Sequence, residues 1–207
     1  MAQFFSIHPD NPQPRLIRRA VEIVRAGGVM VYPTDSCYAL GCRLGDKAAL
    51  ERIRAIRKRD DRHHLSLVCH DLAEIAVYAK VDNHQFRLLK RATPGGYTFL
   101  LRATRETPKR VAHPGRRTIG LRVPDHRVAR ALLAELGEPL LSSTLMLPGD
   151  ELPLNDAHEM RRRLEHQVDL ILDCGSCGIT PTTIVDLTGE EPVIVRRGKG
   201  SLAPFGA

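Results

Sequence analysis

No stretch of this 207-residue sequence approaches the roughly 20 consecutive apolar residues that a membrane-spanning helix needs. Residues 1–10 lack the basic segment and following apolar segment of a secretory signal peptide. Cysteine is scarce: the five cysteines are scattered, and an odd number does not suggest a framework of disulfides. We therefore expect a cytoplasmic protein with reduced thiols and no membrane association.

Several well-known active-site motifs are also absent. No Gly-x-Gly-x-x-Gly follows a predicted strand, and Gly198-Lys199 lacks the upstream glycine of a phosphate-binding loop. There is no Gly-x-Ser-x-Gly, and His158-Glu159 is not followed by the second histidine of a zinc helix. Cys174-x-x-Cys177 has the spacing of half a zinc site, but a chain of this length folds without metal, so we expect free thiols and no metal site.

The charge of the chain is unbalanced. Lys and Arg together number 31 against 24 Asp and Glu, which gives a net charge of +7, and arginine far outnumbers lysine. A basic surface favours polyanionic partners, and the arginine fork binds phosphate through two parallel hydrogen bonds. The composition is equally compatible with a basic soluble protein that has no such partner.

Helical and strand patterns alternate along the whole chain without a linker or an internal repeat. We therefore predict one α/β domain over residues 1–207, with a large mixed sheet and flanking helices. Part of the sheet should be antiparallel, because the last three strands are separated by short gaps. Helices are predicted over residues 12–26, 46–56, 71–78, 83–91, 125–136 and 156–167, and strands over 29–32, 65–69, 97–102, 118–123, 140–144, 168–172, 182–187 and 193–197.

A cluster of polar residues follows the first predicted buried strand, which ends at Tyr32-Pro33. Thr34 and Ser36 offer hydroxyl groups and Asp35 offers a carboxylate, at a position where α/β proteins often bind ligands. The alternative is an ordinary polar turn in which Asp35 bonds to its own backbone.

Two further segments carry arginines in suggestive places. The basic run Arg57–His64 follows a predicted helix and is either a phosphate-binding loop or a solvated one. In the strand Thr118–Val123, a period of two places Thr118, Gly120 and Arg122 on one face. An arginine on a sheet surface either pairs with a carboxylate or holds a ligand anion.

Several motifs occur in a characteristic order, and together they resemble the YrdC/YciO family, the YciO branch most closely. The resemblance covers nearly the whole chain and implies a twisted α/β sheet with a concave, positively charged cavity. The motifs are Phe4–Pro12, Tyr32–Gly41, Thr93-Pro94-Gly95 with Thr98, Arg122-Val123-Pro124, Gly137–Ser142, Met146–Gly149, Pro181–Asp186 and Arg196-x-Gly198.

The resemblance also implies an activity and a set of site residues. Characterised members make threonylcarbamoyl-AMP from L-threonine, bicarbonate and ATP with Mg²⁺, releasing pyrophosphate, as the first step of a tRNA modification. Arg57 and Arg59 would act by charge alone, since no covalent nucleophile is needed. A threonine-like substrate is expected at Thr34, Asp35, Thr118 and Arg122, and the nucleotide at Arg57, Arg59, Ser142, Thr144, Met146, Thr182 and Arg196.

The chain departs from the synthase pattern in two segments. The pattern Lys-x-Arg-Pro is replaced by Arg57-Lys58-Arg59-Asp60, and Ser-x-Asn is replaced by Thr144-Leu145-Met146. Methionine lacks the amide donor and acceptor of asparagine. Three functions therefore stay open: a weak synthase, a protein that binds double-stranded RNA, tRNA or a nucleotide without that chemistry, and an enzyme with another small substrate. We expect a monomer or a weak dimer.

Overall fold

A computed structural model describes residues 1–58 and 65–206 as an α/β domain built on a ten-stranded mixed sheet. The strand order is β1-β8-β2-β3-β7-β4-β6-β5-β9-β10, with β1 and β10 at the two edges. The strands are β1 (Gln3–Ser6), β2 (Met30–Tyr32), β3 (Ala39–Arg43), β4 (Ser66–Val68), β5 (Tyr97–Arg102), β6 (Thr118–Arg122), β7 (Leu140–Thr144), β8 (Leu170–Asp173), β9 (Thr183–Asp186) and β10 (Val193–Arg196).

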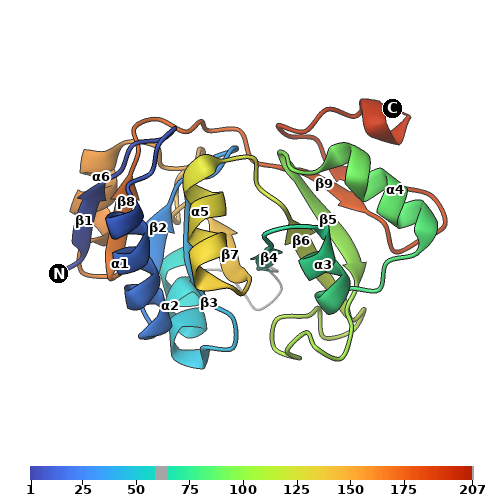
Figure 1. The fold of residues 1–207 in the computed structure, drawn as a ribbon, viewed down its shortest axis with the longest axis horizontal. Coiled ribbons are helices and arrows are strands. Elements are labelled where there is room, and N and C mark those ends of the chain that lie inside the picture. The colour runs from blue at the N-terminus through green and yellow to red at the C-terminus, as the bar shows by residue number, and fades with distance from the viewer. Residues whose placement is uncertain (59–64, 207) are drawn as a thin grey trace.

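Helices cover the two halves of the sheet in pairs (Figure 1). In one half, α1 and α5 lie side by side and bury their apolar faces against β2 and β8. In the other half, α3 and α4 lie over β5, β6 and β9. The helices are α1 (Pro14–Arg25), α2 (Lys47–Arg57), α3 (Leu72–Tyr78), α4 (Asn83–Ala92), α5 (Arg127–Leu136) and α6 (Ala157–Leu164), and a short 3₁₀ turn spans Ala203–Phe205.

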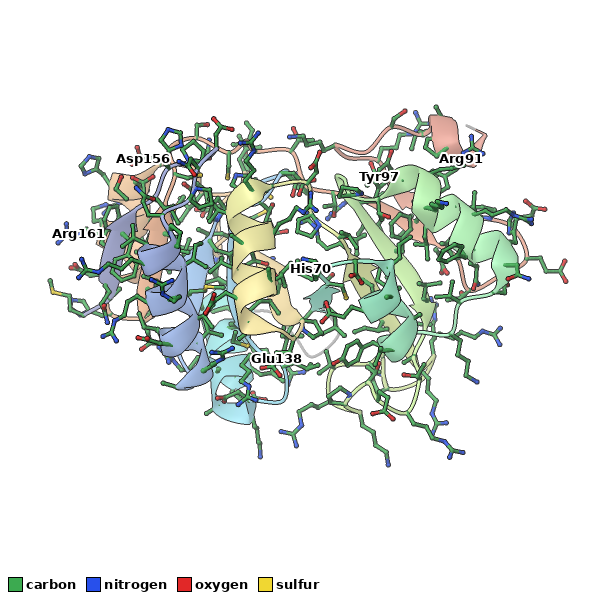
Figure 2. The ribbon with its side chains drawn as sticks, viewed as in Figure 1. His70, Arg91, Tyr97, Glu138, Asp156 and Arg161 are labelled. Carbon is green, nitrogen blue, oxygen red and sulfur yellow. The ribbon has the colours of Figure 1, made fainter. Side chains whose placement is uncertain are left out.

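The predicted helix starts are partly confirmed. Asp46, Asp71 and Asp156 cap α2, α3 and α6, each accepting a hydrogen bond from the backbone three residues on (Asp156 is labelled in Figure 2). The helix predicted from Asn83 begins there, but its cap is the preceding residue, Asp82, and not Asn83 itself. The side chains of Asp82 and Gln85 each accept a hydrogen bond from the backbone N–H of the other residue.

Other element ends also differ from the prediction. The helix expected from Asp125 begins two residues later, at Arg127, and the first helix begins at Pro14. The helix expected to reach residue 167 ends at Leu164. Strands β1 and β3 were not predicted; β1 is an edge strand whose residues are almost all exposed, so it lacks the alternation that marks a half-buried strand.

Strand register identifies two faces of the sheet. Residues that pair across β3, β7, β4 and β6 alternate between an apolar set, such as Leu40, Leu67 and Leu121, and a set of small or polar residues, such as Ser142 and Gly120. The apolar set belongs to the main core. We call the other face, which continues onto β5, β9 and β10, the open face.

Candidate functional site

A cavity of about 340 Å³ lies on the open face of the sheet. Its floor comes from residues that pair in register on neighbouring strands, so they lie in a row across the sheet. Gly120 keeps this floor open, because a Cβ there would stand 2.9 Å from the Ser66 hydroxyl. The described lining contains four arginines and six hydroxyl side chains: Arg54, Arg57, Arg122, Arg196, Ser66, Thr98, Ser142, Ser143, Thr144 and Thr182.

Arg122 is positioned as strand periodicity predicts, on the same face as Gly120 and within the cavity lining. Its Nη2 donates to the carboxylate of Asp35 and its Nη1 donates to the Ser36 hydroxyl at 3.3 Å. The two charged side chains are almost fully buried, at 9% exposed for Arg122 and 8% for Asp35. Of the two alternatives, the pair with a carboxylate is the one observed, and it ties the segment after β2 to the end of β6.

Thr34 forms the turn that was expected of Asp35. Its Oγ1 donates to the carbonyl of Cys37 at 2.6 Å and accepts from the backbone N–H of Ser36 at 3.2 Å. This local network leaves the Asp35 carboxylate to reach Arg122. The Asp35 carbonyl accepts a hydrogen bond from Lys199 Nζ. Side chains from three distant parts of the chain therefore meet around Asp35.

Arg57 is the last residue of α2 and is buried. Its Nη1 donates to the backbone carbonyls of Thr144 and Met146, so the guanidinium is held at the end of β7. Met146 contributes this carbonyl to the site, whereas its side chain is outside the described cavity lining. The second basic residue predicted there, Arg59, lies outside the described residues.

Three of the hydroxyl side chains that line the cavity bond to another hydroxyl group. Thr98 and Thr182 bond to each other at 2.8 Å, and Arg196 Nη2 donates to the Thr182 carbonyl at 2.9 Å. Ser142 bonds to the Tyr32 hydroxyl at 2.7 Å. Burial raises the pKa of Tyr32 to about 12, so its phenol stays neutral.

Not every residue predicted for the site comes together. Thr118 lies on the open face but at the opposite end of β6 from Arg122, roughly 13 Å away at the usual rise of a strand. It is also outside the described cavity lining. Conversely, Arg54 and Ser66 line the cavity but were not predicted for the site. Arg54 could have been predicted, because it precedes Arg57 by three residues and so lies on the same face of the helix.

The five cysteines all lie within the described residues and are free thiols. Burial raises the pKa of Cys37 and Cys174 and raises that of Cys177 to about 12, so these groups are un-ionised thiols at neutral pH. Within residues 1–58 and 65–206, no group of three histidine, cysteine or acidic side chains is arranged to hold a metal ion. None of the helices in these same ranges is long and apolar enough to cross a membrane.

The protein is an α/β protein with an arginine-lined cavity on one face of its sheet. Comparison with known proteins identifies its family. Residues 22–198 match the Sua5/YciO/YrdC family, which carries the description "Telomere recombination", and the chain belongs to this family. Escherichia coli YciO, an uncharacterized protein, is 57% identical over 205 residues, which are 99% of this chain and all of YciO. The crystal structure of that protein superimposes with a TM-score of 0.96, covering 99% of this chain and all of the other.

More distant relatives have assigned activities or ligands. A threonylcarbamoyl-AMP synthase of Chromobacterium violaceum is 36% identical over 181 residues, which cover 86% of this chain and 92% of the synthase. P. abyssi Sua5, in a crystal structure complexed with L-threonine, is 25% identical with a TM-score of 0.87; the match covers 95% of this chain and 58% of Sua5.

Proposed function

We propose that the cavity binds a nucleoside triphosphate and a small amino acid, and that the protein is a threonylcarbamoyl-AMP synthase of low activity. The observation that supports this best is the convergence of Arg57, Arg122 and Arg196 with a row of hydroxyls in one cavity. Arginine and hydroxyl donors suit phosphate and carboxylate oxygens. The threonylcarbamoyl-AMP synthase of C. violaceum and the threonine complex of P. abyssi Sua5 supply the reaction and the amino acid.

The reaction joins two anions, so the protein must chiefly supply positive charge and alignment. The carbamate formed from threonine and bicarbonate attacks the α-phosphorus of ATP, and pyrophosphate leaves. Arg57 would face the phosphates from the end of β7, where its carbonyl contacts fix it. Thr144 would donate to phosphate oxygens, whereas the hydroxyl of Ser142, on the same strand, donates to the Leu40 carbonyl at 3.2 Å; a role of Ser142 at the nucleotide stays a prediction. Fixed donors of this kind stabilise charge as it develops on the transferred group.

The amino acid would bind where Arg122 meets Asp35. Thr34 shapes the turn, and we propose that the Asp35 carboxylate accepts from the substrate ammonium while Arg122 faces its carboxylate. Thr182 and Arg196, on the far wall, would contact the nucleotide. Thr118 stays a prediction on the same face.

The residues present fit a nucleotide that brings its own Mg²⁺. The described cavity lining contains no aspartate or glutamate, whereas Mg²⁺ bound by protein usually has one or two carboxylates. Mg²⁺ carried on the phosphates would neutralise charge on the leaving pyrophosphate. The predicted role of Arg59 in binding the phosphates stays a prediction.

A pyrophosphate assay tests this function. Incubation of the protein with ATP, Mg²⁺, bicarbonate and L-threonine should release pyrophosphate at a rate that depends on threonine. Met146→Asn should leave this rate close to that of the unchanged protein, because the side chain at position 146 lies outside the described cavity lining. Pyrophosphate release that is undetectable in both proteins at high concentration, or independent of threonine, would rule the synthase out.

RNA binding is a second candidate function, favoured by a basic loop between β5 and β6. The loop is anchored by Thr104 and Thr107, which donate to the carbonyls of Val77 and Tyr78. Arg54 Nη2 in the cavity lining donates to the Arg110 carbonyl, so the loop borders the cavity. Its exposed basic side chains are Arg105, Lys109, Arg110, Arg116 and Arg117.

Salt dependence tests this second candidate. If the loop contacts an RNA backbone, affinity for a short RNA duplex should fall steeply with salt, and replacing Arg116 and Arg117 by glutamine should flatten that dependence. Binding that is insensitive both to salt and to this double change would exclude the loop as an RNA surface.

A further inference from the structure

Strand β10 forms one edge of the sheet, and its outer side has no strand partner within the described residues. Ile194 packs against the main core, whereas Val193 and Val195, on either side of it, are 59% and 55% exposed. Proteins usually protect an edge strand from pairing by placing charged side chains along it. On β10 the exposed side chains in the middle of the strand are apolar, so this edge is suited to contact with another protein surface.

The charges that flank this apolar segment have opposite signs. Glu191 lies three residues before Ile194, and Arg197 lies three residues after it. Both side chains are exposed, and neither makes an ion pair or a side-chain hydrogen bond within the described residues. Arg196, by contrast, directs its guanidinium inward, to a carbonyl just before β9. We call residues 191–197 the β10 edge, which has an acidic end, an apolar middle and a basic end.

The order of these groups is complementary to itself when a second copy runs in the opposite direction. We propose that two copies of the chain associate through the β10 edge, as antiparallel strands related by a twofold axis at Ile194. Each Glu191 then faces Arg197 of the partner subunit, and each Val193 faces Val195 of the partner subunit. Side chains directly opposite on antiparallel strands have Cβ atoms roughly 4.5–5.5 Å apart, so both the charges and the valines come into contact. A parallel arrangement would instead place like charges together.

The dimer should be weak, because the β10 edge is short. The register of β10 on β9 shifts between Ile194 and Arg196, and a bulge of this kind bends the strand and limits how many residues a partner can pair with. Stable interfaces bury about 1,200–2,000 Å² in total, which is more than two short strands supply. We therefore expect a dissociation constant on the order of 100 µM. Val195 also lines the cavity, so the partner subunit would stand at the border of the cavity.

Sedimentation velocity of the full chain, at concentrations from about 1 to 500 µM, tests the proposal. The unchanged protein should pass from monomer to dimer over this range. Glu191→Arg and Arg197→Glu each place like charges opposite each other at both ends of the interface, so each should weaken association about tenfold. An equimolar mixture of these two variants should associate about as readily as the unchanged protein, because the mixed pair again has opposite charges at both ends.

A matched pair of valine changes is the control for the apolar middle. Val193→Lys should abolish the dimer, whereas Val77→Lys, at a valine on α3 that is 48% exposed, should leave it unchanged. The melting temperature of each variant shows that it is folded.

Three results would overturn the proposal. A chain that stays monomeric at about 500 µM does not pair through this edge, which is then free for a strand of another protein. A dimer that neither charge change weakens uses another surface. Single changes that weaken association without recovery in the mixture show that Glu191 and Arg197 do not face each other. The pyrophosphate assay measures the proposed function independently of all three.

Discussion

Replacing Arg57 by methionine should lower kcat/KM for ATP by at least about tenfold, since a charged donor contributes about 1.5–3 kcal/mol per hydrogen bond to phosphate. Methionine keeps much of the length of the side chain and removes the charge. The structure fixes the guanidinium at the Thr144 and Met146 carbonyls, so no other described residue takes its exact place at the end of β7. The measurement is the steady-state rate of pyrophosphate release over a range of ATP concentrations.

Two further variants make the Arg57 result specific. Arg57→Lys keeps the charge but loses the fork, so its rate should fall between those of the wild type and Arg57→Met. Arg19→Met is the control. Arg19 is an exposed arginine on α1 that pairs with Glu22 and is outside the described cavity lining, so this change should leave the rate unchanged. The melting temperature of each variant separates loss of folding from loss of activity. A rate for Arg57→Met within threefold of wild type would remove this arginine from the reaction.

Breaking the pair between Asp35 and Arg122 should destabilise the protein by about 3–5 kcal/mol, because either single change leaves one buried charge without its partner. Asp35→Asn and Arg122→Met each do this. The double variant removes both charges and should recover most of the lost stability, since a buried ion pair and a neutral replacement of similar size have similar free energies. Urea unfolding of the four proteins gives the coupling energy directly.

The exposed pair of Arg19 with Glu22 is the control for this cycle. Its side chains are 55% and 61% exposed, so Arg19→Met should cost no more than about 1 kcal/mol. If the Asp35 and Arg122 single variants lose as little as this control, or if the double variant is as unstable as the sum of the two, the buried pair does not hold the site together.

Local pattern predicted the position of Arg122 but not its partner. A period of two along β6 placed Arg122 beside Gly120 on one face, and the structure confirms this. Its contact with Asp35 joins residues 87 positions apart. That contact depends on how β3, β7, β4 and β6 assemble in the sheet, and no local pattern carries this information.

The role of Met146 in the structure differs from the role predicted for it, because the contribution comes from the backbone. The prediction concerned the side chain of Met146, since methionine replaces an asparagine of the synthase pattern. In the structure this residue contributes its carbonyl to Arg57, and the side chain lies outside the described cavity lining. A backbone group is present whatever the residue, so its role is invisible in a motif.

The sequence analysis did not predict β1 and β3, because neither strand alternates between buried and exposed residues. The edge strand β1 is exposed along most of its length, and β3 is buried at four consecutive residues and contains Gly41. The second omission mattered, since β3 pairs with β7 and fixes the turn at Thr34 and Asp35 beside the cavity.

A crystal structure of the full chain with a non-hydrolysable ATP analogue, Mg²⁺ and L-threonine tests the central claim most directly. We predict phosphate oxygens within hydrogen-bond distance of Arg57 and Arg196, and threonine at Arg122. A nucleotide bound elsewhere on the protein, with the arginine-lined cavity filled only by solvent, would contradict the account.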